Sequence, residues 1–473
     1  MTSFYKIVLQ SVAWFPILSK NREDVKPVGV QLCNPNPRIL VAHLLTPLHP
    51  HLLSDIITSV VNVRQPFFPF SLMRLLSLLL LVSFAFVSLS EIASAQTKVP
   101  KYKKIVLSDK FHAEGSCIGD FNKDGIPDIA VGHFWYEGPD FKKAHKFFEG
   151  EDFDPTKYSN CFGMFSGDFN GDGWDDILIC PHPGTDGFWC ENPKNAGGLW
   201  KQHPVSKELG NESQDFADIL GTGRKSLLFN RNGWFGFATP NPEKPYEPWD
   251  FIAINESEDK RYQRYTHGLG YGDITGNGKL DIIEREGWWE QPADPKKPWK
   301  FHKFPFSDAA AHMLVYDVDG DGLNDVVTAS HCHLYGFAWF KQVRKGTEIT
   351  FEKIVLIPQS STPFDRARAT FPVVSQLHAF VAVDMTGNGV PDVITGKRFW
   401  AHGPKGDVEP DAPAILMWWE TKRDGDKSTL VPHIIDEDSG VGTQFAVGDL
   451  NGDGIPDIVI GNKKGAFVFL SEK

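Results

Sequence analysis

Residues 168–180 read DFNGDGWDDILIC, and this stretch decides the fold. Aspartate, asparagine and glycine dominate its first nine positions, and a run of apolar residues follows at once. Small polar residues with glycine mark a tight turn, and a short apolar run after such a turn predicts a buried β-strand. The stretch therefore predicts a loop that leads directly into a strand of a sheet.

The same pattern recurs along the chain as Asp-x-(Asp/Asn/Thr)-x-(Asp/Asn)-Gly-x-x-Asp followed by a β-branched run. A degraded copy, DILGTGRKSLLF, opens at Asp218, and the six complete copies open at Asp120, Asp168, Asp273, Asp317, Asp384 and Asp449. The seven starts are separated by 48, 50, 55, 44, 67 and 65 residues. This spacing suits one four-stranded blade of a β-propeller and is too long for a leucine-rich repeat.

The residues around each copy predict four short strands. The apolar strand is followed by an aromatic one, such as Phe134-Trp135-Tyr136 or Trp288-Trp289, and then by a more polar one. Short strands with frequent turn signals and no long helical pattern predict an all-β protein. Seven such units predict a seven-bladed β-propeller of four-stranded blades over residues 96–473.

The two ends of this region predict how the ring closes. Only Ser471, Glu472 and Lys473 follow Leu470, so the last unit lacks a fourth strand. Residues 103–108, which read KKIVLS, resemble the outer strands inside the chain. We expect this N-terminal strand to complete the last blade and to cover an exposed sheet edge, so that deletion of residues 100–110 unfolds or aggregates the domain.

A leader precedes the repeats. Residues 73–95 have a basic start at Arg74, an apolar run and a small-residue cleavage site at Ala93 and Ala95, which together predict a signal peptide. The alternative, a membrane anchor, is less favoured because the apolar run is short. We therefore expect translation to start at Met73, residues 1–72 to be a mis-called or disordered upstream extension, and the protein to be exported to the periplasm or the extracellular space without membrane insertion after cleavage.

Composition excludes some classes of protein. The chain has 48 basic and 60 acidic residues, a net charge of -12, which argues against binding of nucleic acid through a broad positive field. Cleavage before residue 96 removes seven basic and four acidic residues and leaves a net charge of −15 on the exported part. That part has few cysteines, of which Cys180 and Cys190 could bridge neighbouring strands, so the core is expected to supply most of the stability.

The loops of the repeat predict calcium sites. Carboxylates and amides at positions 1, 3, 5 and 9, with glycine at position 6, can wrap oxygen ligands around Ca²⁺. Asp218 opens a copy without these ligands and is expected to bind nothing; the alternative for all the loops is a polar hairpin turn. The four more charged sites are Asp120/Asn122/Asp124/Asp128, Asp168/Asn170/Asp172/Asp176, Asp317/Asp319/Asp321/Asp325 and Asp449/Asn451/Asp453/Asp457, and the two weaker ones are Asp273/Thr275/Asn277/Asp281 and Asp384/Thr386/Asn388/Asp392.

These loops resemble the FG-GAP or VCBS repeats of integrin α-chain propellers, and the resemblance covers almost the whole region after the leader. It implies that each loop joins the first two strands of a blade on one rim and that calcium there is structural. Up to six Ca²⁺ ions are expected on this basis, and chelation is expected to lower the melting temperature.

Histidines lie at the other end of the predicted first strands. His267, His312 and His378 stand five or six residues before the first aspartate of their loops, so the repeat is expected to bring them to the opposite mouth of the channel. Imidazoles that converge in this way predict a metal site, with Zn²⁺ as the default, and the alternative is separate hydrogen-bonded residues of the channel wall. Loops at the same mouth contribute further polar residues, which include His331, Tyr335, Lys397 and Arg398.

A narrower resemblance concerns the segments THGLGYGDITGNGKLDIIEREGWWEQP, YDVDGDGLNDVVTASHCHLYGFAWFKQ and GKRFWAHGPKGD. They are similar to the propeller domain of aldos-2-ulose dehydratases, which eliminate water from keto-sugars. The resemblance implies that a metal on His267, His312 and His378 polarises a ketone. It also implies that a neighbouring histidine, such as His331, or Tyr335 removes the α-proton, and that Lys397 or Arg398 holds the enolate. Those enzymes carry cupin domains after the propeller, and this chain ends at Lys473.

The sequence therefore leaves two functions open. The first is a carbohydrate-active lyase of the dehydratase type, and the second is a non-catalytic propeller that binds a glycan or a protein partner. Glycoside hydrolysis is less attractive, because Glu284 and Glu286 form the one carboxylate pair that is not assigned to calcium.

Overall fold

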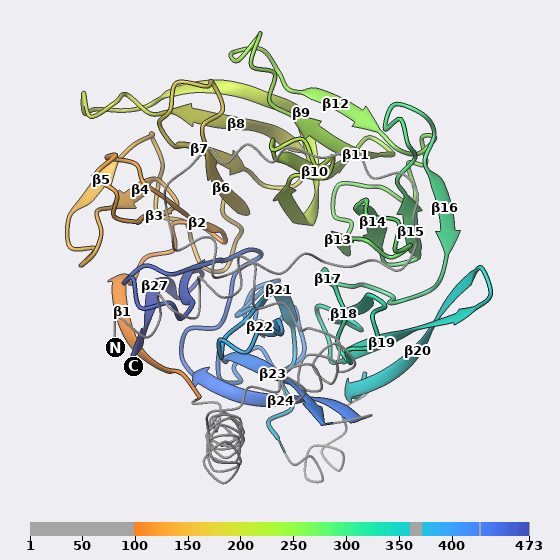
Figure 1. The fold of residues 1–473 in the computed structure, drawn as a ribbon. Coiled ribbons are helices and arrows are strands. Elements are labelled where there is room, and N and C mark those ends of the chain that lie inside the picture. Colours follow the sequence, from red (N-terminus) through yellow and green to blue (C-terminus); the bar gives the residue numbers. More distant parts are fainter. Residues whose placement is uncertain (1–98, 360–370, 425–426, 473) are drawn as a thin grey trace, which may run out of the picture. The chain divides into compact units, whose positions relative to one another are not determined.

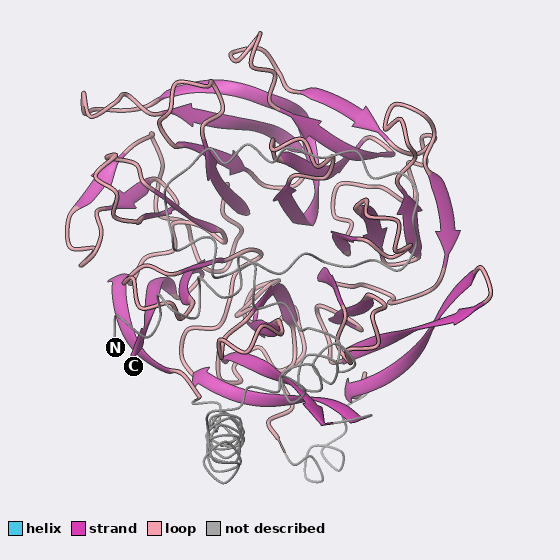
Figure 2. Ribbon diagram, viewed as in Figure 1, coloured by secondary structure: helices cyan, strands magenta, loops and turns pink. Residues whose placement is uncertain are grey.

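A computed structural model describes residues 99–359, 371–424 and 427–472, which belong to one compact unit, Ala95–Lys473. These residues form 27 β-strands. Figure 2 shows them as strands and loops without a helix, so the all-β prediction is confirmed. The predicted extension over residues 1–72 and the predicted signal peptide over residues 73–95 lie outside the described residues. Among the described residues, no helix has the length and apolar character needed to span a membrane.

The strands form five sheets (Figure 1). Three of the sheets have four strands. The first has the order β1-β27-β26-β25, from β1 (Lys101–Ser108), β25 (Ala446–Gly448), β26 (Asp457–Asn462) and β27 (Gly465–Glu472). The second consists of β2 (Ser116–Gly119), β3 (Asp128–Val131), β4 (Phe134–Tyr136) and β5 (Ala144–Lys146). The third consists of β21 (Leu377–Val383), β22 (Asp392–Lys397), β23 (Leu416–Asp424) and β24 (Lys427–Asp436).

The other two sheets are larger. The seven-stranded sheet runs from β6 to β12: β6 (Gly163–Gly167), β7 (Asp176–Cys180), β8 (Thr185–Glu191), β9 (Lys201–Ala217), β10 (Ser226–Arg231), β11 (Trp234–Thr239) and β12 (Asp250–Ala253). The eight-stranded sheet has the order β16-β15-β14-β13-β17-β18-β19-β20. Its strands are β13 (Leu269–Gly272), β14 (Asp281–Glu284), β15 (Gly287–Glu290), β16 (Lys300–Lys303), β17 (His312–Tyr316), β18 (Asp325–Ala329), β19 (Phe337–Lys345) and β20 (Glu348–Ile357).

These two sheets differ from the expected separate four-stranded sheets for identifiable reasons. Strand β9 is continuous over 17 residues, so it serves as the outer strand of one repeat unit and the first strand of the next. Strands β13 and β17 pair in parallel, with Leu269 opposite His312. A Cβ on Gly270 would lie 1.8 Å from the carbonyl oxygen of Met313, so glycine is what allows these two backbones to meet.

The repeat units contact one another in chain order. Strand β2 contacts β6, β9 contacts β13, β17 contacts β21, and β2 also contacts β25 and β26 of the last unit. Figure 1 shows the units around a common centre, with β6, β13, β17 and β21 toward it. Apolar clusters fill the space between neighbouring units; one of them joins Trp418 of β23 to Ile458 of β26.

The expected pairing of the N-terminal strand with the last unit is confirmed. Strand β1 runs antiparallel to β27, with Lys101 opposite Glu472 and Ile105 opposite Val468. The two ends of the described chain therefore lie in one sheet, and β1 covers the edge that β27 would otherwise expose.

Four units repeat one side-chain arrangement on their two outer strands. A histidine stacks on a tryptophan of the neighbouring strand, with ring centroids 4.1–4.8 Å apart. The same histidine contacts a glutamate, with the nitrogen and oxygen 2.7–2.9 Å apart. The four sets are Trp135/His145/Glu137, Trp189/His203/Glu191, Trp288/His302/Glu290 and Trp418/His433/Glu420.

The predicted pairing of Cys180 with Cys190 is wrong. Cys190 of β8 lies opposite Ile177 of β7, three residues away from Cys180. All five described cysteines are buried free thiols, so packing and hydrogen bonds hold the described unit together.

Candidate functional site

The predicted calcium loops begin where the first strand of each unit ends. In every copy the first aspartate accepts a hydrogen bond from the backbone N–H of the glycine at position 6. In the copy at Asp168, for example, the Gly173 nitrogen lies 2.7 Å from Oδ2. The seven glycines that donate this bond are Gly125, Gly173, Gly223, Gly278, Gly322, Gly389 and Gly454.

The third-position side chains make hydrogen bonds close to their own turns. Three asparagines accept the backbone N–H of the fifth residue on Oδ1 at 2.9–3.0 Å, and two threonine hydroxyls lie 3.4–3.5 Å from the first aspartate. The asparagine amides donate to the carboxylates of Asp124 and Asp172, and in the last loop to Ser471. The five residues are Asn122, Asn170, Asn451, Thr275 and Thr386.

The fifth-position side chains follow one rule in all six complete loops. An oxygen of each accepts the backbone N–H of the residue two positions later, at 2.7–3.0 Å. Short polar side chains of this kind bond to their own backbone and stabilise turns. The six residues are Asp124, Asp172, Asn277, Asp321, Asn388 and Asp453.

The side chains at positions 3 and 5, which are predicted calcium ligands, thus also make hydrogen bonds within the turn. In a tight turn the nearest partners of a short side chain are backbone N–H groups, so each of these oxygens first supports the turn. An oxygen that accepts one hydrogen bond keeps a second lone pair. Calcium ligation by these residues therefore stays a prediction.

The degraded copy at Asp218 shows which residues the turn requires in the absence of the predicted calcium ligands. Asp218 and Gly223 make the same hydrogen bond at 2.6 Å, although Leu220, Thr222 and Ser226 replace the other ligand positions. The turn therefore forms without carboxylates or amides at positions 3, 5 and 9. The polar-turn alternative explains the first aspartate and the glycine, but it does not require the further acids of the six complete copies.

The ninth-position aspartates are buried. Burial raises the pKa of Asp128, Asp281, Asp325 and Asp392 to about 6, and that of Asp176 to about 8. A buried carboxylate with a raised pKa is stabilised by a nearby cation. The six buried aspartates at this position are Asp128, Asp176, Asp281, Asp325, Asp392 and Asp457.

One of the predicted loops brings three carboxylates together among the described residues. The oxygens of Asp317, Asp319 and Asp325 lie within 4.8 Å of one another. The Lys341 ammonium pairs with Asp319 and, at 3.2 Å, with Asp321. This loop is therefore the one in which the described geometry comes nearest to a set of carboxylate ligands.

The central site is built from one position of the repeat. Four residues that stand six positions before the first aspartate of their copies are Glu114, Glu212, His267 and His378. Glu114, His267 and His378 lie at or near the start of the first strands of their units, and Glu212 lies within the long strand β9, six residues before its loop. The Glu212 carboxylate contacts both imidazoles, with Oε2 3.5 Å from His267 Nε2 and 3.9 Å from His378 Nε2.

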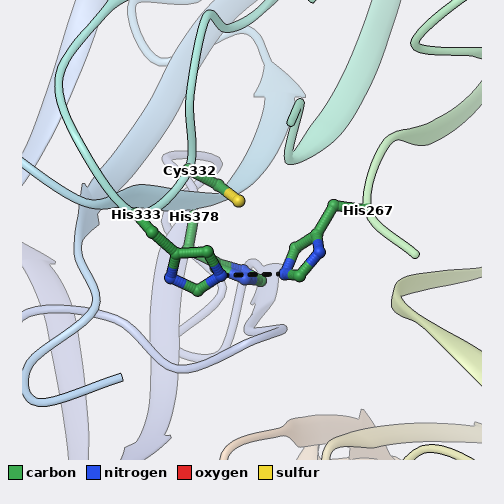
Figure 3. A group of neighbouring side chains, drawn as sticks. All are labelled: His267, Cys332, His333 and His378. Atoms are coloured by element: carbon green, nitrogen blue, oxygen red, sulfur yellow. Dashed lines mark hydrogen bonds between the residues drawn. The ribbon is translucent and has the colours of Figure 1, made fainter. Parts of the chain in front are cut away.

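His267 and His378 belong to a larger group of possible metal ligands. Cys332 and His333, from the loop between β18 and β19, complete it, and one nitrogen or sulfur atom of each side chain lies within 4.8 Å of the others. Figure 3 shows the four side chains converging from three segments of the chain, with Nε2 of His333 3.1 Å from Nε2 of His267. We call this group the central cluster.

Arg398 ties the central cluster to two buried carboxylates. Its guanidinium donates to Glu114 Oε1 at 2.7 Å and to Glu212 Oε2 at 2.8 Å, and its Nη1 lies 3.2 Å from His378 Nε2. Arg398 is 2% exposed, and both glutamates are also buried. The cation and the two carboxylates therefore hold Glu212 and His378 in fixed positions.

The electrostatics of the site leave two of its imidazoles neutral. Burial, followed by the charge of Arg398, lowers the pKa of His378 well below its ordinary value, and burial with His267 lowers the pKa of His333. Burial alone would lower the pKa of His267, but Cys332 and Glu212 outweigh it and raise that pKa to about 10. Burial opposes ionisation of Glu212, yet His267 and Arg398 hold its pKa well below the usual range.

His312, predicted as the third ligand, does not join the central cluster. Its Nε2 lies 3.2 Å from the carbonyl oxygen of Gln214, and it lines a separate cavity of about 340 Å³ with Asp215. His312 stands five residues before Asp317, whereas His267 and His378 stand six residues before their aspartates. Because successive residues of a strand point to opposite faces, a difference of one position turns the side chain away.

The other predicted site residues surround the central cluster in different ways. Tyr335 is buried in the same loop as Cys332 and His333, and the His331 ring lies 6.4 Å from the His333 ring. Lys397 is also buried, but its ammonium donates to Ser375 Oγ and to the Glu409 carbonyl oxygen, both at 2.8 Å. Lys397 therefore points to a neighbouring loop.

An exposed set of rings lies beside the central cluster. The His402 ring lies 4.4 Å from that of His333, and His402 Nδ1 lies 2.7 Å from Asp407 Oδ1. Tyr158 contacts both His402 and His182 through ring centroids 6.4 and 5.5 Å apart. Tyr265 follows His182 at 5.7 Å. We call Tyr158, His182, Tyr265 and His402 the aromatic rim.

Sequence reasoning missed Glu114, Glu212, Tyr158 and Tyr265. A strict count of six positions before each first aspartate finds the two glutamates together with His267 and His378. The tyrosines lie in loops between repeat units, which vary in length and carry no repeated signal.

Comparisons with known proteins identify one repeat. Residues 441–466, which include β25, the loop at Asp449, all of β26 and the first two residues of β27, match the FG-GAP repeat family. No curated protein matches the chain.

Two solved structures are similar over much of the chain. The Tc holotoxin pore of Photorhabdus luminescens is 17% identical over 73% of this chain and 16% of its own, with a TM-score of 0.33. The V. cholerae biofilm matrix protein Bap1 is 11% identical over 66% of this chain and 87% of its own, with a TM-score of 0.30. The resemblance to aldos-2-ulose dehydratases stays a prediction. The chain thus contains an FG-GAP repeat at residues 441–466, within an all-β unit of repeated loop-and-strand segments.

Proposed function

We propose that the protein is an exported seven-bladed β-propeller that binds a carbohydrate at the central cluster and eliminates water from it with the help of a bound metal ion. The contacts between units in chain order and the pairing of β1 with β27 support a closed ring. The FG-GAP match at residues 441–466 supports the repeat type.

The observation that carries the proposal is the convergence of His267, Cys332, His333 and His378. Three imidazoles and a thiol within 4.8 Å of one another are a donor set that Zn²⁺ accepts. The buried Nδ1 atoms of His333 and His378 make no hydrogen bond within the described residues. The residues therefore fit a zinc ion, which would polarise a ligand carbonyl as a Lewis acid.

The aromatic rim is the proposed ligand contact. Ligand sites combine aromatic faces with a few convergent polar groups, and the rim adds exposed rings to the buried carboxylates and imidazoles behind it. A keto-sugar has a carbonyl for the central cluster and hydroxyl groups for the surrounding polar side chains.

His402 is the proposed proton acceptor. It is 42% exposed on its side chain, and the Asp407 carboxylate 2.7 Å from Nδ1 orients the ring. In the proposed elimination His402 takes the proton next to the carbonyl, the carbon–oxygen bond to the β-hydroxyl breaks, and a carbon–carbon double bond forms. The proton and the departing hydroxyl leave as one water. Glu212 and Arg398 keep His267 and His378 in place.

The six complete loops are the proposed calcium sites. The turn at Asp218 forms without the acids at positions 3, 5 and 9, so a turn alone does not require them in the complete copies. Hard oxygen ligands around a glycine turn favour Ca²⁺. Lys341 competes for the loop at Asp317, so we expect weaker binding there than the charge of that loop suggests.

The test measures metal content and product together. The purified protein is treated with a mild chelator, and we expect the wild type and His302→Ala, a control outside the site, each to retain one more equivalent of zinc than His378→Ala. Incubation with keto-sugars is expected to produce the absorbance of a conjugated enone in the wild type, and none in His402→Ala, which keeps its zinc. Protein that retains no zinc and forms no enone would overturn the proposal.

A non-catalytic binding module is the second candidate, and the FG-GAP match favours it. In that case the protein retains calcium alone after mild chelation, and it binds a glycan or a protein partner without converting it.

A further inference from the structure

A second group of ligating side chains lies in the first repeat unit, apart from the central cluster. His112 lies between β1 and β2, His133 between β3 and β4, and Asp152 after β5. One nitrogen or oxygen atom of each lies within 4.8 Å of the others. None of these residues contributes to the central cluster or to the calcium loops.

The hydrogen bonds of His112 leave one nitrogen available. Its Nε2 lies 2.8 Å from Ser108 Oγ, which also accepts the backbone N–H of Lys110. If Nε2 carries the proton for Ser108, the lone pair of Nδ1 is unshared. A partner on the far nitrogen is how proteins fix the tautomer of a metal-binding imidazole.

The contact between His112 and Asp152 is close but is not a hydrogen bond. Nδ1 lies 3.0 Å from Asp152 Oδ1, yet this buried nitrogen has no hydrogen-bond partner of acceptable geometry. With the proton of His112 on Nε2, Nδ1 and the Asp152 carboxylate oxygen are both acceptors, and a cation between them would satisfy both. His112 and His133 are 6% and 5% exposed, so water does not offset the cost of the unpaired nitrogen.

The second imidazole faces the same point. The rings of His112 and His133 lie 5.0 Å apart at 86°. Gly150 packs against His133, and a Cβ there would lie 2.7 Å from the ring, so a larger residue would displace it.

A cavity of about 470 Å³ is lined by His112 and His133. Phe148 and Phe188 form apolar parts of its lining, and Glu149, Asn160 and Gln202 supply polar groups. A site with three protein ligands beside a cavity keeps coordination positions for water or a polar ligand.

We propose that His112, His133 and Asp152 form a second metal site, which binds a divalent transition ion of the zinc class with its open positions toward this cavity. Two imidazoles and one carboxylate are a ligand set found for such ions. Ser108 belongs to β1, so the bound ion also ties the N-terminal strand to the first unit. Binding therefore stabilises the folded protein.

The experiment uses the full chain with Cys332→Ser and His267→Ala, so that the central cluster does not contribute. Zn²⁺ is titrated into metal-stripped protein, and we expect one equivalent to bind and the melting temperature to rise. Asp152→Asn, at a half-exposed position, is expected to weaken binding at least tenfold, and His133→Ala to abolish it. Glu149→Gln, in the same cavity but outside the three ligands, keeps binding.

Co²⁺ distinguishes the two sites by colour. In the wild type we expect a sulfur-to-cobalt charge-transfer band from Cys332, whereas in the Cys332→Ser/His267→Ala protein the cobalt spectrum lacks this band and disappears with His133→Ala. Zinc binding that is unchanged by both Asp152→Asn and His133→Ala would overturn the second site, as would no binding at all. Neither outcome bears on the central cluster, which its own variants test.

Discussion

Arg398 is buried beside two buried carboxylates, and this arrangement decides how the central cluster behaves. Its guanidinium lies 2.7 Å from Glu114 and 2.8 Å from Glu212. A buried ion pair is weak evidence for net stability, but removal of one partner leaves the other charge buried and unpaired. Arg398, Glu114 and Glu212 therefore position the side chains of the central cluster, and the loss of any one of them leaves a buried charge unpaired.

Arg398→Met is expected to lower the free energy of unfolding by about 3–5 kcal/mol, because Glu114 and Glu212 lose their cation. Arg285→Met, at a partly exposed ion pair with Glu286, is expected to change it by less than about 1 kcal/mol. Urea unfolding followed by tryptophan fluorescence measures both. Glu114→Gln in the Arg398→Met protein is expected to restore part of the loss, and equal losses in Arg398→Met and Arg285→Met would contradict this reading.

Because Lys397 is buried, we expect the free energy of unfolding to depend on pH. Burial lowers its pKa from 10.5 to about 8. Between these values the unfolded chain holds the proton that the folded chain has lost, so the free energy of unfolding rises with pH across the window. The gain is ~3 kcal/mol at most for this lysine.

Unfolding at a series of pH values from 8 to 10.5 is expected to show a steeper rise in the wild type than in Lys397→Met. Lys463, whose pKa burial also lowers to about 8, adds to the rise in both proteins, so the comparison is the difference in slope. Lys300→Met, at an exposed lysine, serves as the control and keeps the wild-type slope. Equal slopes in all three proteins would show that Lys397 keeps its proton.

At single positions, the sequence predicted the types of residue at the central cluster better than their geometry. His267 and His378 were found because the repeat places them equally, and Arg398 because its polarity suits the loop near the channel mouth. The prediction that His312 is a third ligand was wrong, because His312 stands one position closer to its loop and therefore points to the other face of the strand. Cys332 and His333 lie in a loop, and no spacing in the sequence indicated their contact with His267.

Among the elements, β1 has the clearest separate role. It lies at the edge of the last unit, and Ile105 packs against the apolar cluster that includes Val468. The adjacent Val106 is 58% exposed and points the other way. Ile105 and Val106 are therefore neighbouring positions of one strand, one packed against the core and the other exposed, at which the same substitution can be compared.

Ile105→Asp is expected to lower the free energy of unfolding by ~2–4 kcal/mol, because a charged group replaces an apolar one against the core. It is also expected to increase the aggregated fraction in size-exclusion chromatography, since β27 becomes an exposed edge when β1 detaches. Val106→Asp, the same change at the neighbouring position, is expected to leave both measurements nearly unchanged. Similar behaviour of the two variants would mean that β1 does not hold the last unit.

The elements themselves were largely predictable. The repeated loop predicted the strand that follows it, and the strand-completing role of residues 103–108 is confirmed by the pairing of β1 with β27. The merging of units through β9 was not predictable, because continuity of hydrogen bonding across two units depends on how closely their backbones approach and not on the residue pattern. The close approach of β13 and β17 at Gly270 was not predictable for the same reason.

At the scale of the whole molecule, calcium bound in the loops of several units is expected to contribute much of the stability of the fold. A ligand at one hundred times its dissociation constant stabilises the folded state by about 2.7 kcal/mol per site, so several occupied loops would dominate the stability. We therefore expect EGTA to lower the melting temperature substantially.

Differential scanning calorimetry measures this effect, and the order of metal addition separates its causes. Added Ca²⁺ is expected to restore most of the loss, and added Zn²⁺ only the part that belongs to the transition-metal sites. A melting temperature that EGTA leaves unchanged would identify the complete loops as polar turns, like the copy at Asp218.

The most direct test of the central claim is an anomalous difference map from a crystal, recorded on both sides of the zinc absorption edge. The account predicts a peak between the side chains of His267, Cys332, His333 and His378, present above the edge and absent below it. A map with no peak at these four side chains, from a crystal grown with zinc present, would contradict the proposed metal centre.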